Sequence, residues 1–454
     1  MKLPGTKDTI AAQATPPGAG ALAVLRLSGP KAFAIASSFL QPVPGDHGRR
    51  TARLLSIFDG KALVDRAVVV FFKGPGSYTG DDTVEISCHG SPYIIRTILN
   101  LAIRGGARLA GPGEFTLRAF LNGKLDLAQA EAVGELIEAG SAGAHRAALS
   151  QVEGAISARV AGIRTEIVDL LARLEARLDD SYEEIPALEL KDFASRAAAA
   201  RERALELAGG FEAGRGIKEG VRVVITGAPN SGKSSLLNAL LGYDRALVSR
   251  QAGTTRDTLE AELDVDGFSV IFTDTAGLNA RAASALEKAG MRRAEKAISR
   301  ADAIILVKDG SIAETPSDLR AERETARLAA SAKVIRVLNK ADLPPKRAAA
   351  AGLSVSAKTG RGLAPLKNLL IAQQKKVFRD SAQAVVTSAR HYAALAEAAG
   401  ELTRLEKMMK GPAPALELGA EHLRGALAAL SSILGETAPE EVLAGIFANF
   451  CVGK

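Results

Sequence analysis

The sequence predicts a multidomain protein of α/β plus α class, with an N-terminal α+β domain, a central helical domain and an inserted α/β domain. The chain has 454 residues, which is more than one hydrophobic core usually organises, so two to four domains are expected. Strand-like and helix-like segments alternate in the middle of the chain, and helical periodicity occurs on both sides of them. Apolar residues make up 47% of the chain, enough to build real cores.

Composition excludes several classes of protein. The two cysteines, Cys88 and Cys451, are too few for a disulfide framework or a zinc cluster. The first twenty residues have no continuous apolar stretch, and Arg26 interrupts the next one, so neither a signal peptide nor a membrane span is expected. We therefore expect a reducing, cytoplasmic location. The net charge of +7 suits an RNA partner, but the excess is spread along the chain and is weak support by itself.

Residues 1–122 are expected to form the N-terminal domain. Three β-branched runs, "ALAVLRLSG", "RAVVVFFKG" and "DTVEISCHG", alternate with Gly and Pro and with one helical stretch near residues 91–104. This pattern is typical of a compact α+β domain, and Cys88 in the third run is expected to be a core residue.

Helical patterns dominate from Leu125 onward. Apolar residues recur at intervals of three and four from Val152 to Leu178, which predicts one long amphipathic helix, and an Ala-rich helix follows at about 192–210. The helical texture resumes after residue 379. Residues 123–217 and 380–454 are therefore assigned to one helical domain, and residues 218–379 to the inserted domain.

The inserted domain carries a phosphate-binding loop. "GAPNSGKSS" fits G-x-x-x-x-G-K-[ST], follows the strand "VRVVITG" and opens a helix. In such a loop backbone N–H groups surround the phosphates, Lys233 neutralises their charge during catalysis, and the Ser234 hydroxyl binds Mg²⁺. The alternative is a glycine-rich turn without a ligand. The residues assigned to the loop are Asn230, Ser231, Gly232, Lys233, Ser234 and Ser235.

Three further motifs indicate that the nucleotide is GTP. The carboxylate of Asp342 can accept hydrogen bonds from N1–H and the N2 amino group of guanine, a pair that adenine lacks. A carboxylate that reaches Mg²⁺ through water is expected at Asp274. The P-loop and these three motifs together predict a Ras-like P-loop GTPase domain. The motifs are "DTAG" (Asp274, Thr275, Ala276, Gly277), "NKAD" (with Asn339, Lys340, Asp342) and "SAK" (Ser356, Ala357, Lys358).

The residue after "DTAG" is Leu278, where GTPases of the Ras type have a glutamine that orients the attacking water. Leucine cannot hydrogen-bond water, so another group must do so. Asn230 is a candidate ligand for a monovalent cation, although it could equally cap a turn. The stretch "SRQAGTTRD" could close over that cation, and Thr255 within it is a second candidate ligand for Mg²⁺.

Collinear motifs along the whole chain resemble the MnmE (TrmE) family of tRNA modification GTPases. They are "DTIAAQATPPGAGALAVLRLSGP", "SYTGDDTVEISCHG", "GPGEFTLRAFLNGKLDLAQAEAV", "AGTTRD" and the C-terminal "FCVGK". The resemblance implies a homodimer formed through N-terminal domains that are similar to tetrahydrofolate-binding domains. It implies folate contacts at Arg26, Glu85, Lys124 and Lys454, although each could instead be a surface charge or a structural ion pair.

The resemblance also implies roles in hydrolysis. It places Mg²⁺ on Ser234 and Thr255, K⁺ on Asn230, Ser249, Gln251 and Thr254, and the water-positioning role on Glu287. The nucleotide-contacting switch residues would be Ser249, Arg250, Gln251, Ala252, Gly253, Thr254 and Thr255. Two departures from the usual family pattern are Ala19, where an arginine is common, and the pair Arg250–Gln251, where an acidic residue and an isoleucine are common.

The chain ends in "NFCVGK", with apolar residues around a thiol where termini usually fray. The resemblance places Lys454 at the folate pocket and Cys451 close to it. A thiol there could act as a nucleophile, or it could be a small buried apolar group.

The resemblance implies a K⁺-activated GTPase that modifies C5 of the wobble uridine, U34, of tRNA. It would add (carboxymethyl)aminomethyl groups with the FAD-dependent partner MnmG and 5,10-methylenetetrahydrofolate, of which 5-formyltetrahydrofolate is an analogue. The alternative is a regulatory GTPase that binds ribosomal RNA as a switch without modification chemistry. The alternative predicts a basic RNA-binding appendage and leaves the folate-like motifs and "FCVGK" unexplained.

Overall fold

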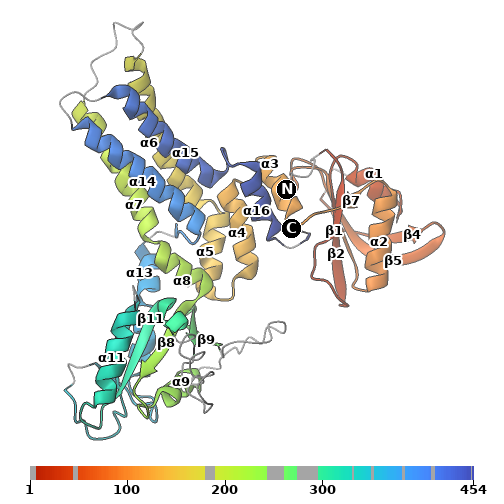
Figure 1. Cartoon of the computed structure of the whole chain (residues 1–454). Helices are drawn as coiled ribbons and strands as arrows, with labels where there is room; N and C mark the ends of the chain where they lie inside the picture. Colours follow the sequence, from red (N-terminus) through yellow and green to blue (C-terminus); the bar gives the residue numbers. More distant parts are fainter. Residues whose placement is uncertain are drawn as a thin grey trace. The chain divides into compact units, whose positions relative to one another are not determined.

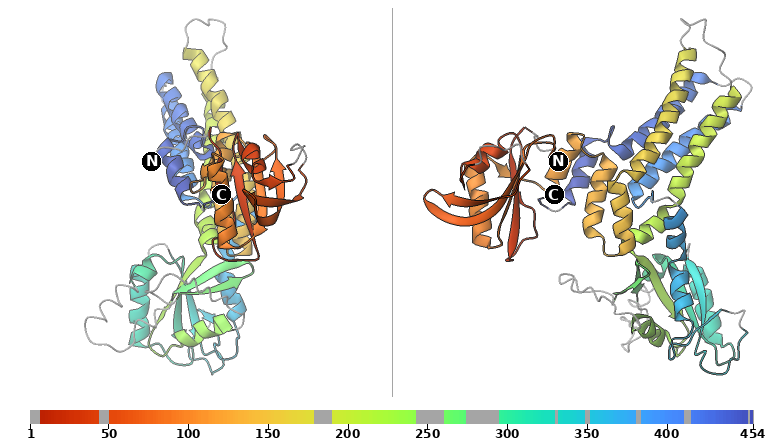
Figure 2. Two further views of the ribbon diagram at one scale, coloured as in Figure 1. Left: turned by 90° about the vertical axis from the view of Figure 1, so that its right-hand side faces the viewer. Right: turned by 180° about the vertical axis from the view of Figure 1, so that it is seen from behind.

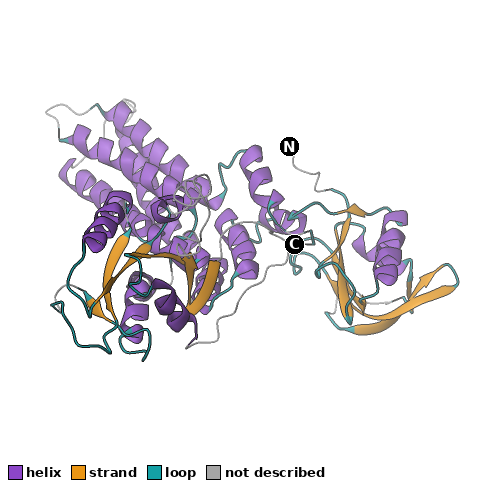
Figure 3. Ribbon diagram, turned by 60° about the horizontal axis from the view of Figure 1, so that its bottom comes forward, coloured by secondary structure: helices purple, strands orange, loops and turns teal. Residues whose placement is uncertain are grey.

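The described residues contain two β-sheets, one in each of two units (Figures 1 and 3). The first unit contains Met1–Gly134, Val160–Leu171 and Ala420–Lys454, and the second contains Glu135–Arg159 and Ala172–Gly419. The computed structural model describes residues 7–43, 50–178, 190–242, 260–273, 295–329, 332–348, 352–380, 384–410, 415–450 and 452–453. Within the described residues no helix is both long and apolar enough to cross a membrane.

The first unit is built on a seven-stranded sheet of order β3-β4-β5-β6-β2-β1-β7. Only β1 and β7 pair in parallel; all other neighbours are antiparallel. The three strands expected from the sequence are confirmed as β2, β5 and β6. The strands are β1 (Ile10–Gln13), β2 (Leu22–Ser28), β3 (Leu40–Gln41), β4 (Arg53–Asp59), β5 (Ala62–Phe72), β6 (Thr83–His89) and β7 (Arg108–Leu109).

Helices α1 (Ala32–Ser37) and α2 (Pro92–Arg104) share a core with this sheet, and α2 confirms the helix expected near 91–104. Cys88 lies in that core and is 1% exposed, as expected. Burial, with a smaller contribution from Asp65, raises the pKa of the Cys88 thiol to about 11. A buried thiol that stays protonated is a packing residue rather than a nucleophile.

The last helix of the chain packs against residues that follow the N-terminal sheet (Figure 2). Helices α3 (Glu114–Leu121), α4 (Leu127–Glu138) and α16 (Glu440–Ala448) contribute to one small core. Its buried members are Leu117, Leu127, Ala130, Leu443 and Phe447. Both ends of the sequence therefore belong to the same unit.

The long amphipathic helix expected from Val152 to Leu178 is confirmed as α6, which runs from Ala155 to Leu178. It begins three residues later than expected, because Val152 ends α5 and Gly154, with φ 89°, separates the two helices. The Ala-rich helix expected at 192–210 is confirmed as α7, which packs along α14 in the second unit. The helices are α5 (Ala142–Val152), α6 (Ala155–Leu178), α7 (Leu190–Gly209), α8 (Phe211–Glu219), α14 (Ala389–Met409) and α15 (Leu416–Leu434).

The sheet of the second unit has six strands in the order β13-β12-β11-β8-β10-β9. All neighbours are parallel except β9, which runs antiparallel to β10. The strands are β8 (Val221–Gly227), β9 (Glu260–Val265), β10 (Phe268–Thr273), β11 (Ala303–Asp309), β12 (Lys333–Asn339) and β13 (Leu353–Ser354). The strands expected at "VRVVITG", "FSVIFT" and "KVIRVLN" are therefore confirmed as β8, β10 and β12.

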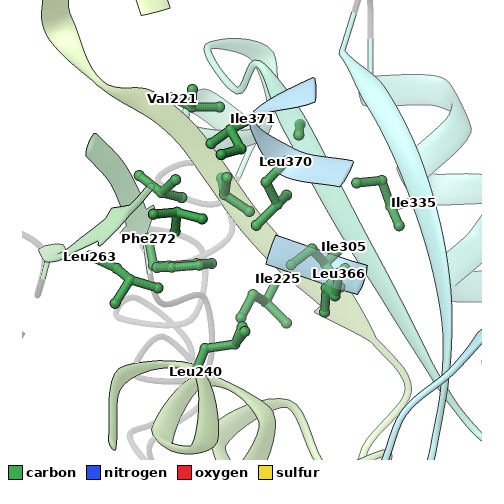
Figure 4. Packing of buried hydrophobic residues seen from close by; sticks show 14 of the residues in the cluster. Val221, Ile225, Leu240, Leu263, Phe272, Ile305, Ile335, Leu366, Leu370 and Ile371 are labelled. Carbon is green, nitrogen blue, oxygen red and sulfur yellow. The ribbon is translucent and has the colours of Figure 1, made fainter. Parts of the chain in front are cut away.

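Apolar side chains of this sheet and of its helices fill a common core (Figure 4). Ile225 and Ile305 from neighbouring strands pack with Leu240 and Leu366 from helices. The helices of this domain are α9 (Lys233–Gly242), α11 (Pro316–Leu328), α12 (Leu363–Leu370) and α13 (Ala372–Asp380). Because β8, β11 and β12 are parallel, their carboxyl ends meet at one edge of the sheet, where open α/β sheets bind ligands.

Candidate functional site

The turn between β8 and α9 is a strained loop suited to phosphate. Gly227 has φ 142°, and a Cβ at this position would lie 2.1 Å from the carbonyl oxygen of Val307. Asn230 has φ 61°, a left-handed conformation that asparagine tolerates better than most residues. The sequence therefore places glycine and asparagine where the backbone needs them, and the loop ends at the N-terminus of α9.

Polar groups converge on this turn. Lys233 Nζ donates to the carbonyl oxygens of Gly227 at 3.0 Å and Ala228 at 2.9 Å, so its ammonium lies over the loop. Ser231 is 2% exposed, and its Oγ has no hydrogen-bond partner among the described residues. Ser234 is exposed in the first turn of α9, where its hydroxyl is available to a metal ion. A helix N-terminus with these groups is an anion-binding arrangement.

One amide joins the three described GTP motifs. Asn339 Nδ2 donates to the Ser231 carbonyl oxygen at 3.1 Å, and Asn339 Oδ1 accepts from the backbone N–H of Ala357 at 3.1 Å. A Cβ on Gly232 would lie 2.2 Å from Asn339 Nδ2, so only glycine allows this approach. The P-loop, "NKAD" and "SAK", which are far apart in sequence, are therefore brought together at the carboxyl edge of the sheet.

The carboxylate of Asp342, the residue expected to recognise guanine, is oriented by a hydrogen bond. Its Oδ1 accepts from Ser356 Oγ at 2.6 Å, while Ser356 itself is fully buried. The hydrogen bond from Ser356, helped by a backbone N–H, lowers the pKa of Asp342 below its ordinary value. The exposed carboxylate is therefore ionised and oriented, as recognition of N1–H and the N2 amino group of guanine requires.

Asp309 is a site residue that sequence reasoning missed. Its Oδ2 accepts from Lys340 Nζ at 2.6 Å, and its Oδ1 accepts from the N–H and the hydroxyl of Ser311. Burial alone would raise the pKa of Asp309, but the hydrogen bonds from Lys340 and Ser311 bring it below its ordinary value. The available signal was a carboxylate at the end of the apolar strand "AIILVKD", beside the position where "NKAD" ends β12.

A second cluster of charged and aromatic side chains lies in the first unit. Arg26 on β2 and Glu85 on β6 are cross-strand partners; Arg26 Nη2 and Nε lie 2.7 and 2.9 Å from Glu85 Oε1. The Arg26 guanidinium carbon lies 5.5 Å from the ring centroids of both Tyr78 and Phe115. Glu85 Oε2 has no hydrogen bond to a described residue, and the side chain is 30% exposed. Sequence reasoning missed both aromatic rings.

The C-terminal segment reaches this cluster. Val452 forms an antiparallel bridge with Pro112, and the Gly453 carbonyl oxygen accepts from Arg26 Nη1 at 3.5 Å. Gly453 has φ 100°, and a Cβ there would lie 2.2 Å from the carbonyl oxygen of Gln13. The expectation that the C-terminus is held in place is confirmed for these two residues.

Lys124 is attached to the same region by a different contact. Its Nζ donates to the Pro75 carbonyl oxygen at 3.0 Å, in the loop that also carries Tyr78. The described contacts do not join Lys124 to Arg26 or Glu85 directly. The loop between β5 and β6 therefore lies between them.

A buried charge network supports the start of α3. Glu114 and Arg118 are 2% and 1% exposed, and Glu114 Oε1 accepts from Arg108 Nη2 at 2.5 Å and from Arg118 Nη2 at 3.1 Å. Asp8 accepts from both arginines, at 2.6 Å from Arg108 Nε and 2.5 Å from Arg118 Nη2. Burial alone would raise the pKa values of Glu114 and Asp8, but these hydrogen bonds lower both. The motif "GPGEFTLRAF" is thus a structural connector.

Ser235 in α9 and Lys358 in the turn after β13 are both exposed. The other predicted site residues lie outside the described residues. They are Ser249, Arg250, Gln251, Ala252, Gly253, Thr254, Thr255, Asp274, Thr275, Ala276, Gly277, Glu287, Cys451 and Lys454.

The fold and the P-loop, "NKAD" and "SAK" geometry define a P-loop protein of the guanine-nucleotide-binding class. Comparisons with known proteins narrow this class. The model of the MnmE helical domain matches residues 127–451, and that of the GTP-binding protein TrmE N-terminus matches residues 9–124. The chain belongs to the MnmE family of tRNA modification GTPases.

Curated relatives match over almost the whole chain. A tRNA modification GTPase MnmE from Chlorobium phaeobacteroides is 38% identical over 98% of this chain and 97% of its own length. Relatives with the same name from Nitrosomonas eutropha and Syntrophotalea carbinolica are 38% and 40% identical, each over 98% of this chain and 99% of their own length. All domains of the relatives therefore have counterparts here.

Proposed function

We propose that this chain is a GTP hydrolase that acts in the modification of tRNA. The observation that supports it most directly is the convergence of the P-loop, Asn339, and the Asp342–Ser356 pair at one sheet edge. Lys233 supplies positive charge to the phosphates, and the Ser234 hydroxyl is placed to hold Mg²⁺. Bound Mg²⁺ would neutralise phosphate charge; this chain's own groups bind and orient the nucleotide.

Guanine specificity is tested at Asp342. Asp342→Asn replaces a carboxylate acceptor by an amide, so preference should shift from GTP toward xanthosine triphosphate, whose base presents an acceptor where guanine presents the N2 amino group. Turnover of both nucleotides is measured for the wild type and the variant. Asp59→Asn, which changes a surface carboxylate of the other unit in the same way, is the control. A variant that still prefers GTP as the wild type does would remove Asp342 from the base site.

Hydrolysis is proposed to depend on K⁺. Asn230 stands in the P-loop, is exposed and has a left-handed backbone, so its side-chain oxygen would be available to a cation beside the phosphates. Ser249, Gln251 and Thr254 would complete the ion's coordination, and Thr255 that of Mg²⁺. Glu287 would position the attacking water in place of the missing glutamine at Leu278.

A one-carbon tetrahydrofolate is proposed to bind at Arg26 and Glu85. The residues fit: the Oε2 atom of Glu85 can accept from a pterin ring, and the rings of Tyr78 and Phe115 already line the arginine. The C-terminal segment is attached to Arg26 through the carbonyl oxygen of Gly453. Lys454, the next residue in the sequence, would contact the folate there. Lys124 would bind the acidic tail of the folate, and Cys451 would lie near the one-carbon unit.

The proposed assembly is a homodimer that works with MnmG, which carries FAD, on the wobble uridine U34 of tRNA in the cytoplasm. The product would be a (carboxymethyl)aminomethyl group at C5. The match to relatives named tRNA modification GTPase MnmE over 97% and 99% of their own length supports this proposal.

A further inference from the structure

One segment of the chain has a marked excess of positive charge, although the excess was expected to be spread along the chain. Residues 343–379 contain eight Lys and Arg residues and no Asp or Glu, whereas the whole chain has a net charge of +7. This segment therefore carries a larger net positive charge than the protein as a whole. Where its cations are exposed and unpaired, such a segment attracts phosphate groups.

The end of this segment forms α12 and α13, which cover one side of the domain's sheet (Figure 2). Leu366, Leu370 and Ile371 pack in the core. Arg361 and Lys376, by contrast, are exposed. The core contacts hold the backbone in place, and the cations lie on the solvent side.

A cavity of about 410 Å³ opens beside α13. Its wall carries two cations, Arg159 from the start of α6 and Lys376 from α13, together with Glu206 from α7. Apolar side chains, including Leu207 and Val377, form much of the remainder. The volume lies in the range of small-molecule sites and is large enough for a phosphate with its ribose.

The two cations on this wall have no ion-pair partner among the described residues. The contrast with their neighbours is clear, because Lys375 Nζ lies 2.5 Å from Asp266 and Arg347 Nη2 lies 2.6 Å from Asp318. Internal carboxylates thus neutralise some cations of the basic segment but not these. Two unpaired cations on the wall of one cavity suit an external anion.

We propose that this cavity and its basic rim bind the phosphate backbone of RNA. Arg159 and Lys376 would contact phosphate oxygens, Leu207 and Val377 would pack against the ribose, and Glu206 would accept a hydrogen bond from the 2′-hydroxyl. That last contact would favour RNA over DNA. The inference rests on the proposed function in tRNA modification and deepens it by naming where the RNA docks.

The test is binding of an unmodified tRNA transcript to the full-length protein, measured by fluorescence anisotropy over a range of KCl concentrations. In the double variant R159Q/K376Q, affinity should fall about tenfold or more near 0.1 M salt, and the slope of log K against log salt should decrease by about 2. The matched control is K61Q/K407Q, which removes two exposed cations elsewhere. It should leave the slope within about half a unit of the wild type.

Two further measurements separate loss of folding from loss of RNA contacts. Unchanged GTP turnover and thermal melting show that R159Q/K376Q is folded. Glu206→Ala, which removes the acceptor, should reduce the preference for RNA over DNA of the same sequence. The inference is overturned if R159Q/K376Q binds tRNA as the wild type does, if both double variants lose affinity equally, or if the wild type does not bind tRNA. The proposed function is decided separately, by the wobble-uridine content of cells that lack the protein.

Discussion

At the scale of single residues, the nucleotide site depends on side chains that bind other parts of the protein. Asn339 contacts the P-loop through Ser231 and the "SAK" loop through Ala357, so one amide sets the position of both loops. Ser356 orients Asp342 in the same way, from a buried position. Such supporting contacts keep a site in its binding geometry before the ligand arrives.

Asn230 is the residue at which the proposed dependence on K⁺ can be tested. GTP turnover should be faster in KCl than in NaCl at equal ionic strength, and Asn230→Ala should remove the difference because the side-chain oxygen is lost. Asn230→Asp retains an oxygen at this left-handed position and should keep part of the stimulation. Equal wild-type rates in the two salts would mean that the transition-state charge is compensated by another group, consistent with the unusual Arg250–Gln251 pair.

At the scale of elements, the buried charge network at the start of α3 should make the first unit sensitive to acid. The folded-state pKa values of Asp8 and Glu114 are lowered, so their stabilisation is present above their ordinary values, 3.8 and 4.5, and is lost as pH falls through the lowered values. Glu114→Gln removes the charge between Arg108 and Arg118 and should cost about 3 kcal/mol at neutral pH.

Circular-dichroism melts at several pH values check this prediction. The wild-type melting temperature should fall steeply below about pH 4.5, and the Glu114→Gln variant should start lower and show a flatter dependence. Asp59→Asn is a suitable control, because its carboxylate pairs with Arg104 at the surface. Identical pH profiles for wild type and Glu114→Gln would contradict a stabilising role for the network.

The C-terminal segment contacts Arg26 of the proposed folate site through Gly453. Gly453→Ala would force a Cβ to within 2.2 Å of the Gln13 carbonyl oxygen, in a backbone conformation that alanine rarely adopts. The segment should shift away from Arg26 and folate affinity should fall at least about tenfold, while GTP turnover persists because the P-loop belongs to the other unit.

Calorimetry with 5-formyltetrahydrofolate measures this effect. Gly445→Ala is the matched control, since a Cβ at Gly445 meets no atom within 4 Å in helix α16. It should bind folate as the wild type does. If Gly453→Ala also binds folate with undiminished affinity, the C-terminal segment does not form part of the pocket.

Sequence reasoning succeeded where a local pattern determines an element. The β-branched runs at β2, β5, β6, β8, β10 and β12 are confirmed, because buried strands need such side chains. It missed short strands such as β3 and β7, and it placed the start of α6 three residues too early. Gly154, with φ 89°, ends the preceding helix at that point although the apolar periodicity is continuous.

The candidate site, like the fold, was predicted only in part from the sequence. Motif spacing predicted the P-loop, Asn339, Asp342 and Ser356, because each follows a strand whose end the β-branched pattern locates. It did not predict Asp309 or the aromatic rings of Tyr78 and Phe115. Their roles arise from strand pairing and loop packing, which bring together residues distant in sequence.

At the scale of the whole molecule, the chain combines a nucleotide domain with a separate unit that contains both chain ends. Its membership of the MnmE family rests on matches that cover nearly the full length of the relatives. The two candidate sites therefore belong to one protein, a GTPase of tRNA modification. This function does not depend on where the RNA docks or on how K⁺ is bound.

Mass spectrometry of tRNA nucleosides tests this claim most directly. Cells that lack the protein should lose the aminomethyl-type modification at C5 of the wobble uridine. The wild-type chain should restore it, and neither Asp342→Asn nor Gly453→Ala should restore it fully, because one impairs GTP recognition and the other the C-terminal segment. A wobble-uridine profile that is unchanged when the protein is absent would contradict the account.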